Sequence, residues 1–274
     1  MAFHPERIPA DIVRHVVAHL DSRKDLYRCA LVNKLFHLAA VPLLWTTLNV
    51  RMKPWARPGP LHPAAVLLQR PEYCLYVFEI CEDTGWTHMS RAILEERLSA
   101  LRLCVNLRSF SWTDSSTFSE NDAAFLTHLD VLQQLHITEL SVKVSAGISP
   151  VVWQRLMQMR GLRSFSLSSS QCVLDDISTW AAAASSTMTH LELSVASEAD
   201  RYPAFIEQLH RLQSLRLDAP CNTIPDLLAY LPNLVALDVR YRLSDRIPAP
   251  HHRRPPAARL RDLTVHVVHG RTAA

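Results

Sequence analysis

Apolar residues near the start of the chain recur with a helical period. Ile12, Val16 and Leu20 lie four residues apart, which places them on one face of an α-helix. Pro9 stands just before this stripe, where proline is favoured in a first helical turn. We predict three short helices between residues 8 and 48. Helices of about ten residues are not stable alone, so these must pack on one another or on a partner.

The two later helices carry residues that start and stop helices. Ser22 and Asp25 have the spacing of a capping box, with Asp in place of the more usual Glu. Asn33 also belongs to the residue types that cap helices. We therefore expect the second helix to follow Ser22, and the third to follow Asn33 and to end at Pro42.

A different pattern runs through the rest of the chain, with apolar residues at the first, fourth and sixth positions of a short segment. Seven such segments begin at Leu107, Ile137, Leu162, Met188, Leu212, Leu234 and Leu260. Their spacing of 22 to 30 residues, with a mean of about 25, matches the period of leucine-rich repeats. Two earlier segments, which begin at Trp45 and Leu75, fit the same phase less cleanly.

Helical patterns lie between these segments, for example over residues 90–103. Strands that alternate with helices at this period predict an α/β fold, a right-handed solenoid with a parallel sheet on its concave face. An ordinary α/β domain with leucine-rich strands is the alternative. We expect a short three-helix unit at residues 6–50, a connecting segment at 51–70 and the repeat array at 71–274.

The N-terminal stretch resembles an F-box over roughly residues 6–50. The landmarks that carry the resemblance are Ile8-Pro9, Ile12, Val16, Asp25-Leu26, Cys29, Leu31-Val32-Asn33 and Leu43-Leu44-Trp45. Phe36 stands where many members of the family carry Trp. With the repeats that follow, the whole chain resembles an F-box/leucine-rich-repeat protein.

The resemblance implies a function and a set of partners. In that family the F-box docks on the Skp adaptor of a cullin-RING ubiquitin ligase, and the repeats hold a protein substrate. Catalysis belongs to the RING and E2 partners, so we expect no enzyme here. The resemblance and the apolar stripe together place the adaptor contact at Ile8, Pro9, Ile12, Val16, Leu31, Val32 and Phe36.

Alternation along the strands predicts which residues face a substrate. The residue between the second and third apolar positions, and the one two further on, must point out of the concave face. The first repeats present mostly hydroxyls there, and the later ones present mixed charge. We predict substrate contact at Glu192, Arg216, Asp218, Asp238, Arg240 and His266. Arg216 and Arg240 have the planar fork that binds a carboxylate or phosphate. A merely solvated sheet face is the alternative.

Composition excludes several other classes of function. The five glycines are scattered, which argues against phosphate-cradling loops. A net charge of +3 is too weak to indicate nucleic-acid binding, although residues 240–274 alone carry +6. No apolar run is long enough to span a bilayer. We expect no cofactor. We also expect no metal site, because His15 and His19 lack the Glu of a zinc-protease motif.

The cysteines and the N-terminus bear on the compartment. None of the six cysteines forms a CxxC pair, and they fall on different repeats as core residues, so we expect no disulfide. The first residues lack the apolar segment of a signal peptide. We expect an intracellular protein, in the cytoplasm, the nucleus or both.

Two alternatives remain beside the ubiquitin-ligase subunit: a scaffold that acts outside a ubiquitin ligase, and an enzyme with an unrecognised site. The end of the array is a separate open question. After Val265 the sequence shows no amphipathic cap helix, although solenoids need a polar terminal cap. Either the tail covers the last strand, or further repeats lie outside this chain.

Overall fold

The computed structural model describes residues 9–51, 62–85, 91–116, 121–170, 177–195, 205–221, 224–242 and 259–268. The helices are α1 (Ala10–Ala18), α2 (Arg23–Ala30), α3 (Lys34–Trp45), α4 (Pro63–Gln69), the 3₁₀ helix η2 (Pro71–Tyr76), α5 (Arg91–Leu103), α6 (Asp122–Gln134), α7 (Pro150–Met157), α8 (Ile177–Ala184) and α10 (Ile224–Tyr230). None of the helices in these ranges is long and apolar enough to cross a membrane.

The three N-terminal helices form a small unit with its own core, as the sequence predicted. Its buried residues are Val13, Val17, Leu26, Ala39 and Ala40. The α3 helix packs against both α1 and α2. Together these contacts give each short helix the burial that it needs for stability.

The helix starts agree with the predicted caps. Ser22 Oγ accepts a hydrogen bond from the Asp25 N–H, and Asn33 Oδ1 accepts one from the Phe36 N–H at 3.0 Å. The Asp25 carboxylate accepts a hydrogen bond from Arg28 Nη1, one turn further along α2.

The predicted end of the third helix was wrong, since α3 runs through Pro42 to Trp45. Proline removes a single intrahelical bond, the one to the carbonyl four residues earlier. That carbonyl belongs to Leu38, which lies on an exposed side of the helix. Ala39, Ala40 and Val41 are buried just before the proline, so packing holds the helix together on its other side.

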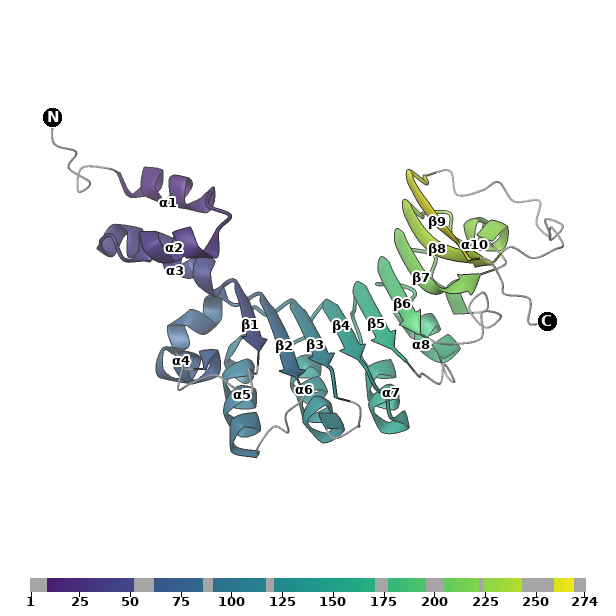
Figure 1. Cartoon of the computed structure of the whole chain (residues 1–274), viewed down its shortest axis with the longest axis horizontal. Coiled ribbons are helices and arrows are strands. Elements are labelled where there is room, and N and C mark those ends of the chain that lie inside the picture. Colours follow the sequence, from purple (N-terminus) through teal and green to yellow (C-terminus); the bar gives the residue numbers. More distant parts are fainter. Residues whose placement is uncertain are drawn as a thin grey trace.

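Nine strands form one parallel sheet in which each strand pairs with the next along the chain. They are β1 (Thr47–Arg51), β2 (Glu79–Gly85), β3 (Ser109–Asp114), β4 (Glu139–Val144), β5 (Ser164–Ser169), β6 (His190–Val195), β7 (Ser214–Cys221), β8 (Ala236–Arg242) and β9 (Asp262–Val268). The sheet lines the inner side of an arc, and helices α4 to α8 lie on its outer side (Figure 1). This is the predicted α/β solenoid with a concave parallel sheet. The sheet starts earlier than residue 71, because β1 pairs with β2.

The apolar positions of the seven repeats point into the solenoid. In β3 the alternation is regular, with Phe110 and Trp112 buried while Ser111 and Thr113 are half-exposed. The last unit differs, because Leu263 and Val265 of β9 occupy the same register as buried residues of β8 but are exposed. The described part of the chain therefore does not cover β9.

The phase of the segment around β2 was predicted wrongly. The pattern was placed on Leu75, Phe78 and Ile80, but Leu75 and Phe78 are exposed. The inward positions are Val77, Ile80 and Glu82, and Glu82 pairs in register with Trp112 of β3. A charged residue at an inward position broke the hydrophobic pattern and shifted its apparent phase by two residues.

Glu82 is compensated by a charge on the facing helix. Arg97 of α5 donates from Nη1 to Glu82 Oε2 at 2.8 Å, and both side chains are at least 94% buried. Burial raises the pKa of Glu82 to about 7, and the Arg97 guanidinium opposes that shift. Within the described ranges the Nε and Nη2 atoms of Arg97 have no hydrogen-bond partner, so this pair is incompletely satisfied there.

The positive charge of Arg97 also contributes to low pKa values at two histidines, His62 and His128. Burial lowers the pKa of His128 to about 4; the contact of its Nδ1 with the Ala124 carbonyl opposes the shift, and the Arg97 charge adds to it. Burial, followed by the Arg97 charge, also lowers the pKa of His62 to about 4. Both imidazoles are therefore neutral at pH 7.

Removing one member of the buried pair should destabilise the array strongly. We expect Arg97→Met to lower the free energy of unfolding by roughly 3–5 kcal/mol, because it leaves Glu82 buried without its partner. The double variant Glu82→Leu/Arg97→Met should recover most of this loss, since an apolar pair of similar volume removes both desolvation costs. Urea unfolding of the three chains measures this. Losses that simply add in the double variant would show that the two side chains do not act as a pair.

The buried histidines should make stability depend on pH below neutrality. Unfolded imidazoles gain protons below about pH 6.5, but His62 and His128 resist until about pH 4, so their stabilisation is lost as the pH falls between these values. Glu82 acts in the opposite sense, because its contribution is lost as the pH rises from 4.5 to about 7. Because two histidines outweigh one glutamate, the free energy of unfolding should decrease as the pH is lowered from about 6.5 to about 4.5.

The variant His128→Phe tests this balance. It keeps an aromatic ring beside Trp112 and Phe110 but removes one titrating group. The slope of unfolding free energy against pH should decrease by about 1 kcal/mol per pH unit between pH 5 and 6. Urea midpoints across that range measure it, with His210→Gln at an exposed position as the control. An unchanged slope in His128→Phe would contradict the assignment.

Candidate functional site

The three-helix unit leaves large apolar side chains in solvent. Ile12 and Val16 of α1, and Leu31 and Val32 after α2, are each more than half exposed. Exposed apolar groups that gather on a small unit mark protein–protein surfaces. These four residues were predicted to contact an adaptor, and the structure places them where a partner can reach them.

The other predicted adaptor residues differ from these four. Pro9 is exposed, Ile8 lies outside the described residues, and Phe36 is half-buried against the core of the three-helix unit. Phe36 therefore stabilises the unit as well as bordering its surface. Tyr27 was not predicted, yet its side chain is 59% exposed. The signal was present, because Tyr27 precedes Leu31 by one helical turn.

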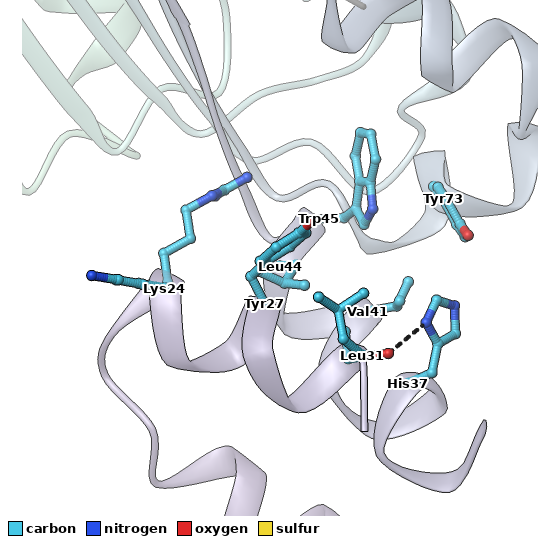
Figure 2. Close-up of a pocket in the computed structure, with 10 residues that line it drawn as sticks. Lys24, Tyr27, Leu31, His37, Val41, Leu44, Trp45 and Tyr73 are labelled. Carbon is cyan, nitrogen blue, oxygen red and sulfur yellow. Dashed lines mark hydrogen bonds between the residues drawn. The ribbon is translucent and has the colours of Figure 1, made fainter. Parts of the chain in front are cut away.

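A cleft of about 610 Å³ opens beside this surface, between α2, α3 and η2 (Figure 2). Val41, Leu44 and Trp45 contribute apolar lining, and the Trp45 ring contacts the Tyr73 ring with centroids 5.1 Å apart. The residues that line the cleft are Arg23, Lys24, Tyr27, Ala30, Leu31, His37, Val41, Leu44, Trp45 and Tyr73. The cleft thus joins the exposed residues of α2 to the first part of the array.

His15 on α1 and His19, the residue that follows this helix, lie in contact. His15 and His19 approach to 3.4 Å between their Nε2 atoms, with an edge-to-face arrangement of the rings. Among the described residues no group of three or more His, Cys, Asp or Glu side chains is placed to hold a metal ion.

The cysteines come closer together than their separation along the chain suggested. Cys74 and Cys104 belong to neighbouring repeats, yet each thiol affects the pKa of the other, and both are buried free thiols. Cys74 Sγ donates to the Leu67 carbonyl and Cys104 Sγ to the Ala100 carbonyl. Burial raises the pKa of Cys104 to about 12 and also raises the pKa of Cys74. Because the thiolate is the reactive form, these thiols are poor nucleophiles. The side chains of Cys172 and Cys221 lie outside the described part.

The concave face carries two rows of side chains that run across the strands. The first row is Ser111, Ser141, Ser166, Glu192, Arg216, Asp238 and Thr264, and the strand register aligns it as predicted. The second row is Thr113, Lys143, Ser168, Ser194, Asp218, Arg240 and His266. Its register holds from β3 to β6 and from β8 to β9. The pairing of β6 with β7 ends at Leu217, one residue before Asp218, and a bulge in β7 pairs the Arg240 backbone with Pro220.

The charged residues of the first row pair with one another. Arg216 lies between two carboxylates, with Nη1 3.3 Å from Glu192 Oε1 and Nε 3.4 Å from Asp238 Oδ2. His266 Nε2 lies 3.2 Å from the other oxygen of Asp238. Ser166 donates to Glu192 Oε2 at 3.1 Å. The charged residues of the first row, together with His266 of the second row, therefore form a continuous polar ladder from β5 to β9.

The second row contains a similar pair. Arg240 Nε lies 2.7 Å from Asp218 Oδ1, and Ser194 donates to Asp218 Oδ2 at 2.8 Å. The structure thus brings all six predicted substrate residues onto one face. Arg216 and Arg240, which were predicted to bind a carboxylate or phosphate of the substrate, contact carboxylates of this chain in the structure. Ion pairs this exposed contribute about 0–1 kcal/mol, so a partner can displace them.

A depression of about 210 Å³ lies on this face across β4 to β7. Its lining includes the hydroxyl residues Ser141, Ser166, Ser168 and Ser194, the charged pair Glu192 and Arg216, Asp218, and Lys143. Lys143 was part of the second row but was not chosen as a contact residue, because the choice favoured the repeats with mixed charge. The sequence could have indicated this residue, because its neighbours in the register, Thr113 and Ser168, are uncharged and offer Lys143 no acidic partner.

A comparison with known protein families finds a match to the segment that contains the three N-terminal helices. Residues 5–51 match the family model described as F-box-like. That match ends at the last residue of β1. A comparison with curated proteins finds no match.

Two solved structures with a similar chain path come from Listeria monocytogenes str. 4b F2365. Internalin C2 is 16% identical with a TM-score of 0.41, and the match covers 72% of this chain and 76% of that one. An internalin designated inlF is 12% identical with a TM-score of 0.40, over 72% of this chain and 58% of that one. Likenesses this low carry no information about partners or activity.

The family match and the sheet describe different parts of the chain. The match covers α1 to α3 and β1, whereas the sheet order, its register and the period of about 25 residues describe the remainder. The chain therefore contains an F-box-like segment at residues 5–51, followed by a solenoid of leucine-rich repeats.

Proposed function

We propose that this protein is a substrate receptor of a Skp–cullin–F-box type of ubiquitin ligase. The observation that carries the proposal is the match of residues 5–51 to an F-box-like model, on a unit whose Ile12, Val16, Leu31 and Val32 side chains are exposed. F-box segments generally bind Skp-type adaptors. Through that adaptor the chain would join a cullin and its catalytic partners, in the cytoplasm, the nucleus or both.

The apolar surface of the helical unit supports adaptor binding on physical grounds. A stable interface needs a few apolar anchors that become fully desolvated when the partner binds. Leu31 and Val32 lie in the turn between α2 and α3, where both side chains project from the unit's own core. Burial of such a side chain contributes about 1.5–3 kcal/mol to binding.

The array supports the role of holding a second protein. Its concave face is an open row of polar side chains on a rigid sheet, and extended concave surfaces are what solenoids use to bind partners. In the proposed role the chain performs no chemical reaction of its own. It would act by holding two proteins at once, which raises the effective concentration of the substrate near the ligase.

Co-purification is the direct test of the proposal. The full chain is expressed with an affinity tag in eukaryotic cells, and the captured proteins are identified with and without proteasome inhibition. A Skp-type adaptor and a cullin should both be recovered. Recovery of the adaptor without a cullin favours a scaffold outside a ubiquitin ligase, and absence of the adaptor overturns the proposal.

Truncation of the exposed anchors should weaken adaptor binding. We expect Leu31→Ala/Val32→Ala to raise the Kd for the purified adaptor at least tenfold, because truncation of hot-spot residues typically costs ~2 kcal/mol or more. Titration by calorimetry measures the Kd. The double variant should unfold at the same urea concentration as the natural chain, because neither side chain contributes to a core.

The matched control for this variant is Val105→Ala/Val151→Ala. Both valines are about as exposed as Leu31 and Val32 but lie on the array, so adaptor affinity should not change. Phe36→Ala is a less selective variant, since Phe36 also packs within the three-helix unit. Equal affinities for the natural chain and Leu31→Ala/Val32→Ala would remove this surface from the interface.

A further inference from the structure

We infer that the depression on the concave face binds the carboxylate of an acidic side chain on a partner protein, with Lys143 as its charge partner. This inference rests on the proposed receptor role and names the chemistry of the segment that the array recognises. Among the described cations of the two rows, Lys143 is the one that pairs with no carboxylate of the chain, and this observation carries the inference.

Lys143 differs from the arginines of the same face. Its side chain is exposed on β4, and within the described part of the chain its ammonium group makes no ion pair or hydrogen bond. Its neighbours in the register are Thr113 on β3 and Ser168 on β5, neither of which carries charge. Arg216 and Arg240, in contrast, each contact a carboxylate of the same face.

Hydroxyl groups surround Lys143 and complete a set of donors. Ser141 and Ser168 line the same depression, and no bond within the described residues occupies their hydroxyls. A carboxylate placed here can accept a charge-assisted bond from the ammonium and further bonds from these hydroxyls. The depression of about 210 Å³ has room for a single side chain rather than for a folded element.

The charges around the depression favour a carboxylate over a phosphate. Glu192 and Asp218 also line it, and the bonds from Ser166 and Ser194 hold these two acids in place. A phosphate carries nearly two negative charges at pH 7 and would face both acids with only one uncompensated ammonium. A carboxylate carries one charge, which the ammonium of Lys143 balances.

The charge of Lys143 is also easy to isolate by experiment. It is the only lysine after Lys53 in the chain, so an amine-directed reagent reports on this position within the array. Lys143→Arg keeps the positive charge but removes the amine, whereas Lys143→Ala removes both. Lys34→Ala, at an exposed site on α3, is the matched control.

The probe is a phage-displayed library of random 16-residue peptides, selected against the purified full chain. We expect selected peptides to share an Asp or Glu, and replacement of that acid by Asn or Gln to raise the Kd roughly ten- to a hundredfold. Lys143→Ala should raise the Kd by the same factor, and Lys143→Arg and Lys34→Ala by less than about threefold. Fluorescence anisotropy with the synthetic peptides measures these constants.

Zero-length cross-linking with a carbodiimide gives a second measurement. The reagent should join the acid of the selected peptide to Lys143 by an amide bond with loss of water, and mass spectrometry should locate that bond. Lys143→Arg should abolish the cross-link while the peptide still binds. A cross-link that maps to another lysine would place the segment elsewhere and overturn the inference.

The remaining outcomes are also decisive. A library that yields no binder, peptides without a shared acid, or unchanged affinity in Lys143→Ala would each overturn the inference. Tighter binding after phosphoserine replaces the shared acid would show that the depression selects phosphate instead. None of these measurements involves the adaptor, so failure here leaves the adaptor result standing, and loss of adaptor binding leaves the peptide result standing.

Discussion

The register of the parallel sheet is the constraint on which the rest of this structure depends. Each repeat contributes one strand, and the pairing of successive strands aligns inward positions with inward positions along the whole array. The same alignment places the polar residues of the outer positions in two continuous rows. A slip of one residue in any repeat would exchange these two sets. Core and recognition surface therefore follow from a single geometric relation, which each repeat satisfies with its nearest neighbours.

Much of the fold could be predicted because the inward residues of most repeats are apolar and recur at a narrow period. The seven units that begin at Leu107 and later were placed correctly, and so were the three helices, whose caps are local to the sequence. The predictions were wrong where the environment of a residue depends on residues that are distant in the sequence or on packing within the folded unit. Glu82 is tolerated at an inward position because Arg97 faces it from another element. Pro42 is tolerated because α3 packs against the core of the three-helix unit through Ala39 and Ala40 before the proline and through Leu44 after it.

The candidate site shows the same division. Alternation along the strands correctly identified which residues face out of the sheet, since that depends only on local geometry. It said nothing about which charges on neighbouring strands neutralise each other. Arg216 contacts two carboxylates, whereas Lys143 forms no ion pair with any residue that the structure describes. The distinction between them requires the side chains of adjacent repeats, which lie some 25 residues apart in sequence.

The spacing of the strands has a consequence for the geometry of any segment that crosses them. Neighbouring strands lie about 4.8 Å apart, whereas an extended chain advances about 3.3 Å per residue. Two strand spacings and three residues of extended chain therefore both cover about 10 Å. A segment laid across the sheet therefore cannot match every repeat with successive side chains. Because side chains of an extended chain alternate between its two faces, a residue and the third one after it point in opposite directions. The same side-chain direction and the same strand position coincide again only after about six residues, over every fourth strand.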